Sequence, residues 1–167
     1  MAIAQSELLR AGQRRPLLKS QVRAGLQKTA FLCHSHRDDK LAEGLQALLA
    51  EQPAEPNMEP KDASMTPEHH RKTASRIQHR IKTCDWFLFL ATANSMTSRW
   101  CPWELGYADG QKQTDRIAIV QTSDSTTTHG NEYMQLYRRV DTSSAGELLW
   151  VPAGSNQGQF VRNVPFL

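Results

Sequence analysis

The sequence contains little cysteine and no long apolar run. Its three cysteines, Cys33, Cys84 and Cys101, are odd in number and have no repeated spacing, which argues against a disulfide framework and favours a reducing compartment. The longest apolar run is far shorter than the roughly 20 residues that a membrane-spanning helix requires. The sequence also lacks an Asn-x-Ser/Thr acceptor for N-glycosylation. We therefore expect a cytoplasmic protein without a membrane span.

Sequence motifs for common cofactors are absent as well. Neither a P-loop nor a Gly-x-Gly-x-x-Gly pattern is present, so no motif supports ATP binding or a Rossmann-type dinucleotide site. Residues 33–36 with Cys84 or Cys101 could suggest zinc, but paired Cys-x-x-Cys or His-x-x-x-His spacing is missing. A buried cysteine at a strand end is the favoured interpretation, and a Cys–His nucleophile pair has no identifiable orienting partner. We expect neither a metal nor a cofactor.

The net charge of the chain is also small. A net charge of +3 does not by itself indicate a nucleic-acid partner. Basic side chains in the helix expected from about residue 66 could form a phosphate or nucleic-acid patch, but no aromatic residues are interleaved with them. A solvated helix face is therefore favoured over nucleic-acid binding. These side chains are Arg71, Lys72, Arg76, Arg80 and Lys82.

Residues 1–28 form a basic N-terminal extension with Glu7 as its single acid. Such a composition is compatible with a targeting or membrane-surface segment, because transit peptides are rich in arginine and poor in acids. The alternative is a solvated helical extension whose apolar side chains pack on the domain or a partner. Pro16 interrupts the amphipathic pattern and favours this alternative. The apolar side chains in question are Leu8, Leu9, Leu17, Leu18, Val22 and Leu26.

From residue 29 onward, short apolar runs alternate with helical patterns in a chain long enough for about one domain. We expect strands at residues 29–33, 57–59, 86–90, 116–121 and 148–151, the second of them a short edge strand in a proline-broken region. Helices are expected from about residues 38, 66, 102 and 132, and residues 92–98 are expected to be a loop. Alternation of this kind predicts a parallel sheet with helices on both faces over residues 29–151, followed by a tail at 152–167.

The stretch from residue 85 to residue 107 organises the rest of this prediction. Residues 86–90 are an unbroken apolar run, as a strand buried on both faces requires. Pro102 then suits the first turn of a helix, which places Glu104 in that turn, just beyond the carboxyl end of a central strand. A first-turn acid also complements the helix dipole without any other role, so Glu104 has both a functional and a purely structural interpretation.

In the flavodoxin-like strand order 2-1-3-4-5, the loops after the first and third strands face each other across a crevice. Backbone N–H groups at the two helix starts could hold phosphates there, and tryptophans could stack on a base or a nicotinamide ring. Such an arrangement suits a nucleotide. The side chains expected to converge are Ser35, His36, Asp38, Asn94, Ser95, Ser98, Trp100, Trp103 and Glu104.

Two segments of the sequence, TAFLCHSHRD at residues 29–38 and SRWCPWEL at residues 98–105, together resemble one known family. The first is similar to the first strand and loop, and the second to the S-x-W-C-x-x-E-L segment, of the Toll/interleukin receptor (TIR) domain family, in particular of its bacterial stand-alone members. The likeness runs from about residue 29 to residue 151. One departure concerns residues 53–66, where the family usually has a strand that ends in an acid and leads into a loop governing assembly and access.

The resemblance implies a flavodoxin-like three-layer α/β/α fold and an enzyme that cleaves the nicotinamide–ribose bond of NAD, its substrate. Glu104 would be the catalytic residue, and the loop carrying Ser35, His36 and Asp38 would line the nucleotide site. Family members also self-associate through TIR–TIR contacts, and a nucleotide product would act on a downstream effector in bacterial antiphage immunity. Two alternatives stay open: a non-catalytic TIR interaction module, and an enzyme similar to nucleoside deoxyribosyltransferases.

Overall fold

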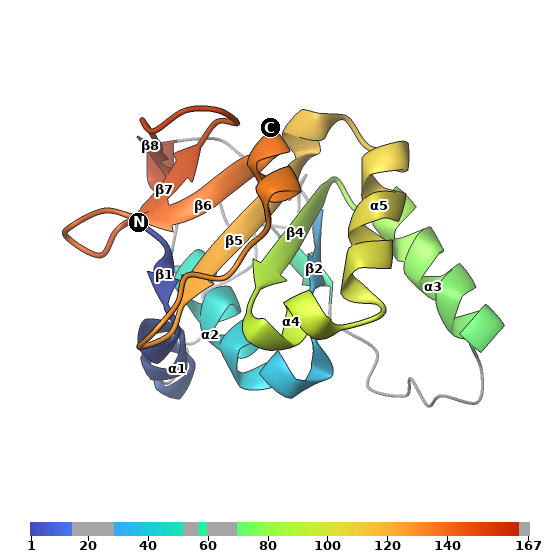
Figure 1. Ribbon diagram of the computed structural model, residues 1–167, viewed down its shortest axis with the longest axis horizontal. Coiled ribbons are helices and arrows are strands. Elements are labelled where there is room, and N and C mark those ends of the chain that lie inside the picture. Colours follow the sequence, from blue (N-terminus) through green and yellow to red (C-terminus); the bar gives the residue numbers. More distant parts are fainter. Residues whose placement is uncertain (15–28, 52–56, 60–69, 164–167) are drawn as a thin grey trace.

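A mostly parallel sheet lies at the centre of the molecule, with helices on both faces (Figure 1). The computed structural model describes residues 1–14, 29–51, 57–59 and 70–163. Its strands are β1 (Ile3–Ala4), β2 (Thr29–Cys33), β3 (Asn57–Glu59), β4 (Trp86–Ala91), β5 (Ile117–Ser123), β6 (Arg138–Thr142), β7 (Leu148–Val151) and β8 (Gln159–Phe160). Its α-helices are α1 (Gln5–Gln13), α2 (Asp39–Ala50), α3 (His70–Thr83), α4 (Ala93–Thr97) and α5 (Cys101–Gln111).

The strand order confirms the flavodoxin-like part of the prediction. The described strands run in the order β3-β2-β4-β5-β6-β7-β8, and β1 pairs with β5. The first four predicted strands thus lie in the order second, first, third and fourth, all parallel. The short edge strand expected at residues 57–59 is present as β3, paired only with β2 among the described strands.

The fifth place in the sheet was predicted wrongly. It is occupied by β6, parallel to β5, whereas the predicted strand at residues 148–151 is β7, which runs antiparallel to β6. The reason is the short connection: residues 143–147 form a tight turn in which Gly146 has a φ of 80°. So short a link can join antiparallel neighbours only, because a parallel crossover needs a dozen or more residues.

Smaller differences from the prediction also concern local structure. The short helix predicted over residues 132–138 is a 3-10 helix, η4 (Glu132–Leu136), and Arg138 already begins β6. The predicted loop at residues 92–98 contains the helix α4, and the predicted tail contributes β8, which pairs with β7. The predicted helix start at residues 66–68 lies outside the described residues.

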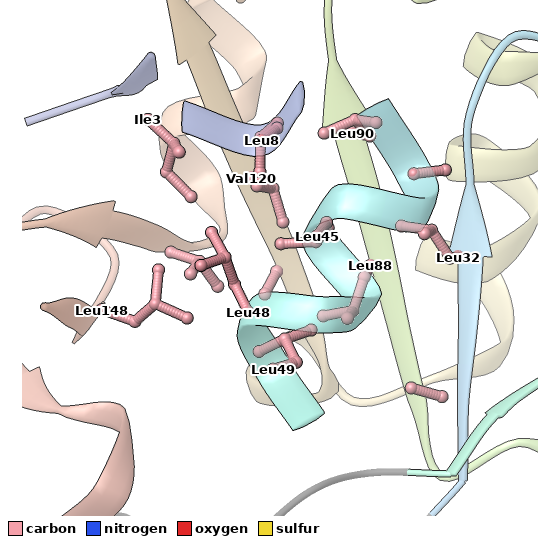
Figure 2. Packing of buried hydrophobic residues seen from close by; sticks show 14 of the residues in the cluster. Ile3, Leu8, Leu32, Leu45, Leu48, Leu49, Leu88, Leu90, Val120 and Leu148 are labelled. Carbon is pink, nitrogen blue, oxygen red and sulfur yellow. The ribbon is translucent and has the colours of Figure 1, made fainter. Parts of the chain in front are cut away.

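Alternating side chains on the parallel strands fill two separate cores. Leu32, Leu88 and Leu90 point to one face, where α2 and α1 cover them (Figure 2). Phe31 and Phe89 point to the other face, where α3 and α5 cover them. Because β2 and β4 are buried on both faces, they are apolar at nearly every position, as expected of central parallel strands.

The N-terminal segment belongs to the first of these cores. Ile3, Leu8 and Ala11 are fully buried, and α1 crosses α2 so closely that a Cβ added at Gly44 would lie 1.9 Å from the carbonyl oxygen of Leu8. Of the apolar side chains predicted to pack here, Leu8 is buried and Leu9 is 41% exposed; the others lie outside the described residues. None of the helices in the described parts of the chain has the length and apolar character of a membrane span.

The close crossing of α1 and α2 predicts opposite effects for two glycine-to-alanine substitutions. Gly44→Ala forces α1 away from α2, and we expect it to lower the free energy of unfolding by about 1–3 kcal/mol. Gly106→Ala in α5 meets no atom within 4 Å and is expected to raise it by about 0.5–1 kcal/mol, because alanine favours the helix. Urea unfolding of both variants measures the difference, and equal effects would contradict this packing.

Candidate active site

The loops that follow β2 and β4 meet at one edge of the sheet. These two strands are parallel neighbours, with Cys33 opposite Phe89, so both loops leave at their carboxyl ends. The chain passes from β2 to the outer strand β3 before it returns to β4, and ligands of open α/β sheets bind where the strand order reverses in this way. The predicted convergence of the two loops is therefore present in the fold.

Asp38 joins these two loops. Its side chain is 3% exposed, and its carboxylate accepts a hydrogen bond from Thr92 Oγ1 at 2.6 Å and another from Asn94 Nδ2 at 2.6 Å. Hydrogen bonds to a carboxylate are shorter and stronger than those between neutral groups. The Asp38 carboxylate therefore fixes the start of α4 against the start of α2.

Thr92 and Ser95 form a reciprocal capping box at the start of α4. Ser95 N donates to Thr92 Oγ1 at 3.0 Å, and Thr92 N donates to Ser95 Oγ at 2.8 Å. The sequence carries this signal as Thr-Ala-Asn-Ser, a capping-box spacing in which serine replaces the more usual glutamate. Reading it would have predicted α4 and the role of Thr92, which the sequence analysis missed.

The first turn of α5 places Glu104. Ser98 Oγ accepts from the backbone N–H groups of Trp100 and Cys101 at 3.2 and 3.3 Å, and Pro102 occupies the first turn. These two features start the helix just after α4. Glu104 then falls in its first turn and is 1% exposed, on the side that faces the sheet.

The Glu104 carboxylate lies next to the thiol of Cys33, the last residue of β2. The Cys33 thiol is fully buried, and its Sγ lies 3.8 Å from the carbonyl oxygen of Cys101. Burial, a hydrogen bond with the side chain of Cys101 and the negative charge of Glu104 together raise the pKa of the Cys33 thiol well above its ordinary value. Glu104 therefore lies beside the carboxyl end of β2.

A row of aromatic side chains runs along α5 beside Glu104. The rings of Trp100 and Trp103 meet edge to face with centroids 5.4 Å apart, and Trp103 and Tyr107 stack at 6.0 Å. Trp100 precedes Glu104 by four residues, so the two side chains share one side of the helix. Trp103 is 37% exposed, so the row leads from the buried carboxylate to the surface.

The remaining predicted site residues differ in accessibility. Ser35 is buried, and its Oγ accepts from Arg37 N at 3.4 Å, which shapes the turn after β2. Ser95 is fully buried in the capping box, whereas His36 is exposed. The structure thus brings Asp38, Asn94 and Ser95 into one hydrogen-bonded network and leaves His36 at the surface.

Two further histidines also lie at this edge, His34 of the segment weighed as a zinc candidate and His129, which the sequence did not point to. His34 is buried, with Nδ1 3.1 Å from the carbonyl oxygen of Leu32 and Nε2 3.2 Å from Asp39 Oδ1. His129 follows β5, and its Nε2 lies 2.9 Å from Asp124 Oδ2. Within the described residues, no group of three or more His, Cys, Asp or Glu side chains could hold a metal ion.

Comparison with known proteins points to one family. A family model described as TIR domain matches residues 30–149. Over 97 residues the chain is 36% identical to the "Probable 3' cyclic ADP-D-ribose synthase ThsB'" of Bacillus cereus (strain MSX-D12). That match covers 55% of this chain and 49% of the relative, so the chain spans about half the length of the curated relative that it matches.

The raised pKa of Cys33 predicts a specific loss of stability at alkaline pH. Above pH 9.0, the ordinary pKa, an unfolded thiol loses its proton while the folded one keeps it, so the free energy of unfolding falls by up to about 1.4 kcal/mol per pH unit. Cys33→Ser removes the thiol that ionises in this pH range. Urea unfolding of both proteins between about pH 8 and pH 10.5 should show the steeper fall in the wild type, and parallel curves would contradict the prediction.

Proposed function

The chain belongs to the TIR domain family, and on that premise we propose that it is an enzyme that cleaves the bond between nicotinamide and ribose in NAD. The single observation that carries the proposal is the place of Glu104. Its carboxylate lies in the first turn of α5, beside Cys33 at the carboxyl edge where β2 and β4 end. The curated relative, named for synthesis of a cyclic ADP-ribose, supports NAD as the substrate.

In the proposed reaction, the bond between ribose C1′ and the pyridinium nitrogen breaks, and its electron pair leaves with nicotinamide. Nicotinamide departs as a neutral molecule, and the positive charge moves onto the ribose as an oxocarbenium ion. A carboxylate close to C1′ stabilises that cation, as in glycoside hydrolysis. Glu104 provides this negative charge from a site with little water, where electrostatic interactions are stronger than in bulk solvent.

Two outcomes complete the reaction. Attack by water at C1′ gives ADP-ribose and releases a proton, whereas attack by a hydroxyl within the same molecule gives a cyclic ADP-ribose and also releases a proton. The name of the Bacillus cereus relative supports the cyclic product. Such a product would serve as a signal for a downstream effector in bacterial antiphage immunity.

The proposed location is the cytoplasm, where reducing conditions keep thiols such as those of Cys33, Cys84 and Cys101 free.

The low exposure of Glu104 suggests that the activity is controlled. A carboxylate that is 1% exposed cannot contact a ribose until the chain around it moves. We place that control in self-association through TIR–TIR contacts, which would shift the population towards an open form. A dilute monomer is then expected to turn over NAD slowly.

Substrate contacts are proposed for the side chains that border Glu104 and the Asp38 network. Trp100 and Trp103 offer aromatic faces to nicotinamide or adenine, and their row extends to the surface. Ser35 and His36 lie on the neighbouring loop, His36 being exposed. Asn94 and Ser95 lie at the start of α4, although the hydroxyl of Ser95 is already used in the capping box.

A non-catalytic interaction module is the second candidate function. The observation that favours it is the same low exposure of Glu104, together with an exposed aromatic surface that includes Trp103. In that case the protein would act by binding other TIR domains. A third possibility, deoxyribosyl transfer, predicts turnover of nucleosides and not of NAD.

Replacement of Glu104 tests the proposed function. Glu104→Gln keeps the shape of the side chain and removes its charge, so we expect nicotinamide release from NAD to fall at least about 100-fold. Glu43→Gln removes an exposed carboxylate on α2 and should leave the rate unchanged. The assay follows nicotinamide by liquid chromatography over a wide range of protein concentration, with and without a crowding agent.

Three results separate the candidates. Release by the wild type that rises with protein concentration and is lost with Glu104→Gln supports the enzyme and its control by assembly. Release that survives Glu104→Gln in full removes Glu104 from the mechanism. Absence of release from an assembled wild type, with nucleosides left intact, leaves the interaction module as the function.

A further inference from the structure

The Asp38–Asn94 hydrogen bond fixes which end of the Asn94 side chain is held inside the protein. Asn94 Nδ2 and Asp38 Oδ1 are 2.6 Å apart, and the second carboxylate oxygen accepts from Thr92 Oγ1 at the same distance. Because an ionised carboxylate has no hydrogen to donate, only the –NH₂ end of the amide can face it. The orientation of the amide is thereby set by chemistry.

The other end of the amide is left as an acceptor. Asn94 is only partly buried, whereas Asp38 is 3% exposed. Among the described residues, no side chain or backbone N–H donates to Asn94 Oδ1 within hydrogen-bond distance. The pair therefore presents a fixed carbonyl oxygen at the carboxyl edge of β4, where the loop that leads to Glu104 begins.

This polarity limits what part of a nucleotide can bind there. A carbonyl oxygen needs a donor, and ionised phosphates have none, so the acceptor disfavours the phosphates at this position. The buried negative charge of Asp38 adds to that repulsion. The hydroxyls of a ribose are donors, and those of the ribose that carries the cleaved bond lie close to its C1′, the carbon on which Glu104 would act.

We infer that Asn94 contacts the substrate by accepting a hydrogen bond from a hydroxyl of the ribose that carries nicotinamide, and that Asp38 acts as a positioning residue that fixes the Asn94 amide. This inference rests on the proposed function, because it takes NAD as the ligand. The inference also changes the role expected of Asp38, which was to line the nucleotide site. Because both carboxylate oxygens of Asp38 accept hydrogen bonds within the protein, Asp38 orients Asn94 instead of contacting the nucleotide.

Binding to a protein that does not cleave NAD tests this inference. In the Glu104→Gln background, we expect Asn94→Ala to weaken NAD binding about 3- to 10-fold, the range for one lost hydrogen bond. Of two NAD analogues, one lacking the 2′ hydroxyl and one lacking the 3′ hydroxyl of that ribose, at least one should bind the parent about 3- to 10-fold more weakly than NAD does. For one of the two analogues, Asn94→Ala should cause no further loss, because both changes remove the same hydrogen bond.

Asp38→Asn distinguishes positioning from a general structural effect. An amide at position 38 can donate as well as accept, so it no longer dictates the orientation of Asn94. We expect this variant to lose the preference for NAD over the same deoxy analogue, while a merely structural defect would weaken both ligands equally. Asn131→Ala, which removes an exposed asparagine that donates to Tyr133, is the matched control and should leave both affinities unchanged.

The outcomes separate the inference from the proposed function. Equal losses for NAD and both deoxy analogues in the Asn94→Ala variant overturn the inference. Unchanged binding in that variant, in a protein whose Glu104 is still required for nicotinamide release, overturns the inference and leaves the proposed function standing. If the assembled wild type neither binds nor cleaves NAD, the proposed function fails and the inference fails with it.

Discussion

Parallel pairing of β2 with β4 determines where every candidate site residue lies. Both strands are buried on two faces, so neither can shift by one residue without moving a set of apolar side chains into the wrong core. Their register therefore fixes the ends of the two strands side by side. The loops that follow are joined by Asp38 through Thr92 and Asn94, and α5 then brings Glu104 back to the end of β2. A change in that pairing would separate the network from the carboxylate.

Much of this arrangement could be predicted from the sequence because the central strands are apolar throughout. The run at residues 86–90 and the Pro102 helix start both lie where the pattern placed them, and the edge strand β3 is present despite its surrounding prolines. By contrast, β6 carries Arg138, Arg139 and Asp141 in five residues and gives no apolar signal. Its charged side chains are accommodated by contacts at the edge of the core, such as the ion pair between Arg139 and Asp141.

The location of the candidate site could be predicted from the sequence. It was harder to predict which of its side chains are engaged in hydrogen bonds within the protein. The position of Glu104 followed from one proline and one strand, both local signals. The use of Asp38 within the protein could not be derived in this way, because it depends on distances between loops that are 54 or more residues apart in the chain, whereas the capping box that holds Ser95 is a local signal. The contact between Cys33 and Glu104 likewise arises only when α5 packs over the end of β2. Long-range contacts of this kind are set by the fold as a whole.

A buried carboxylate is costly to keep in a fold, and the proposed role of Glu104, stabilising a cation, would account for that cost. The most direct test is the structure of the assembled Glu104→Gln variant with NAD bound. Catalysis by Glu104 predicts that ribose C1′ lies within about 3–4 Å of the side chain at position 104, at the edge where β2 and β4 end. A nucleotide bound with C1′ far from that side chain, or bound at another edge of the sheet, would contradict it.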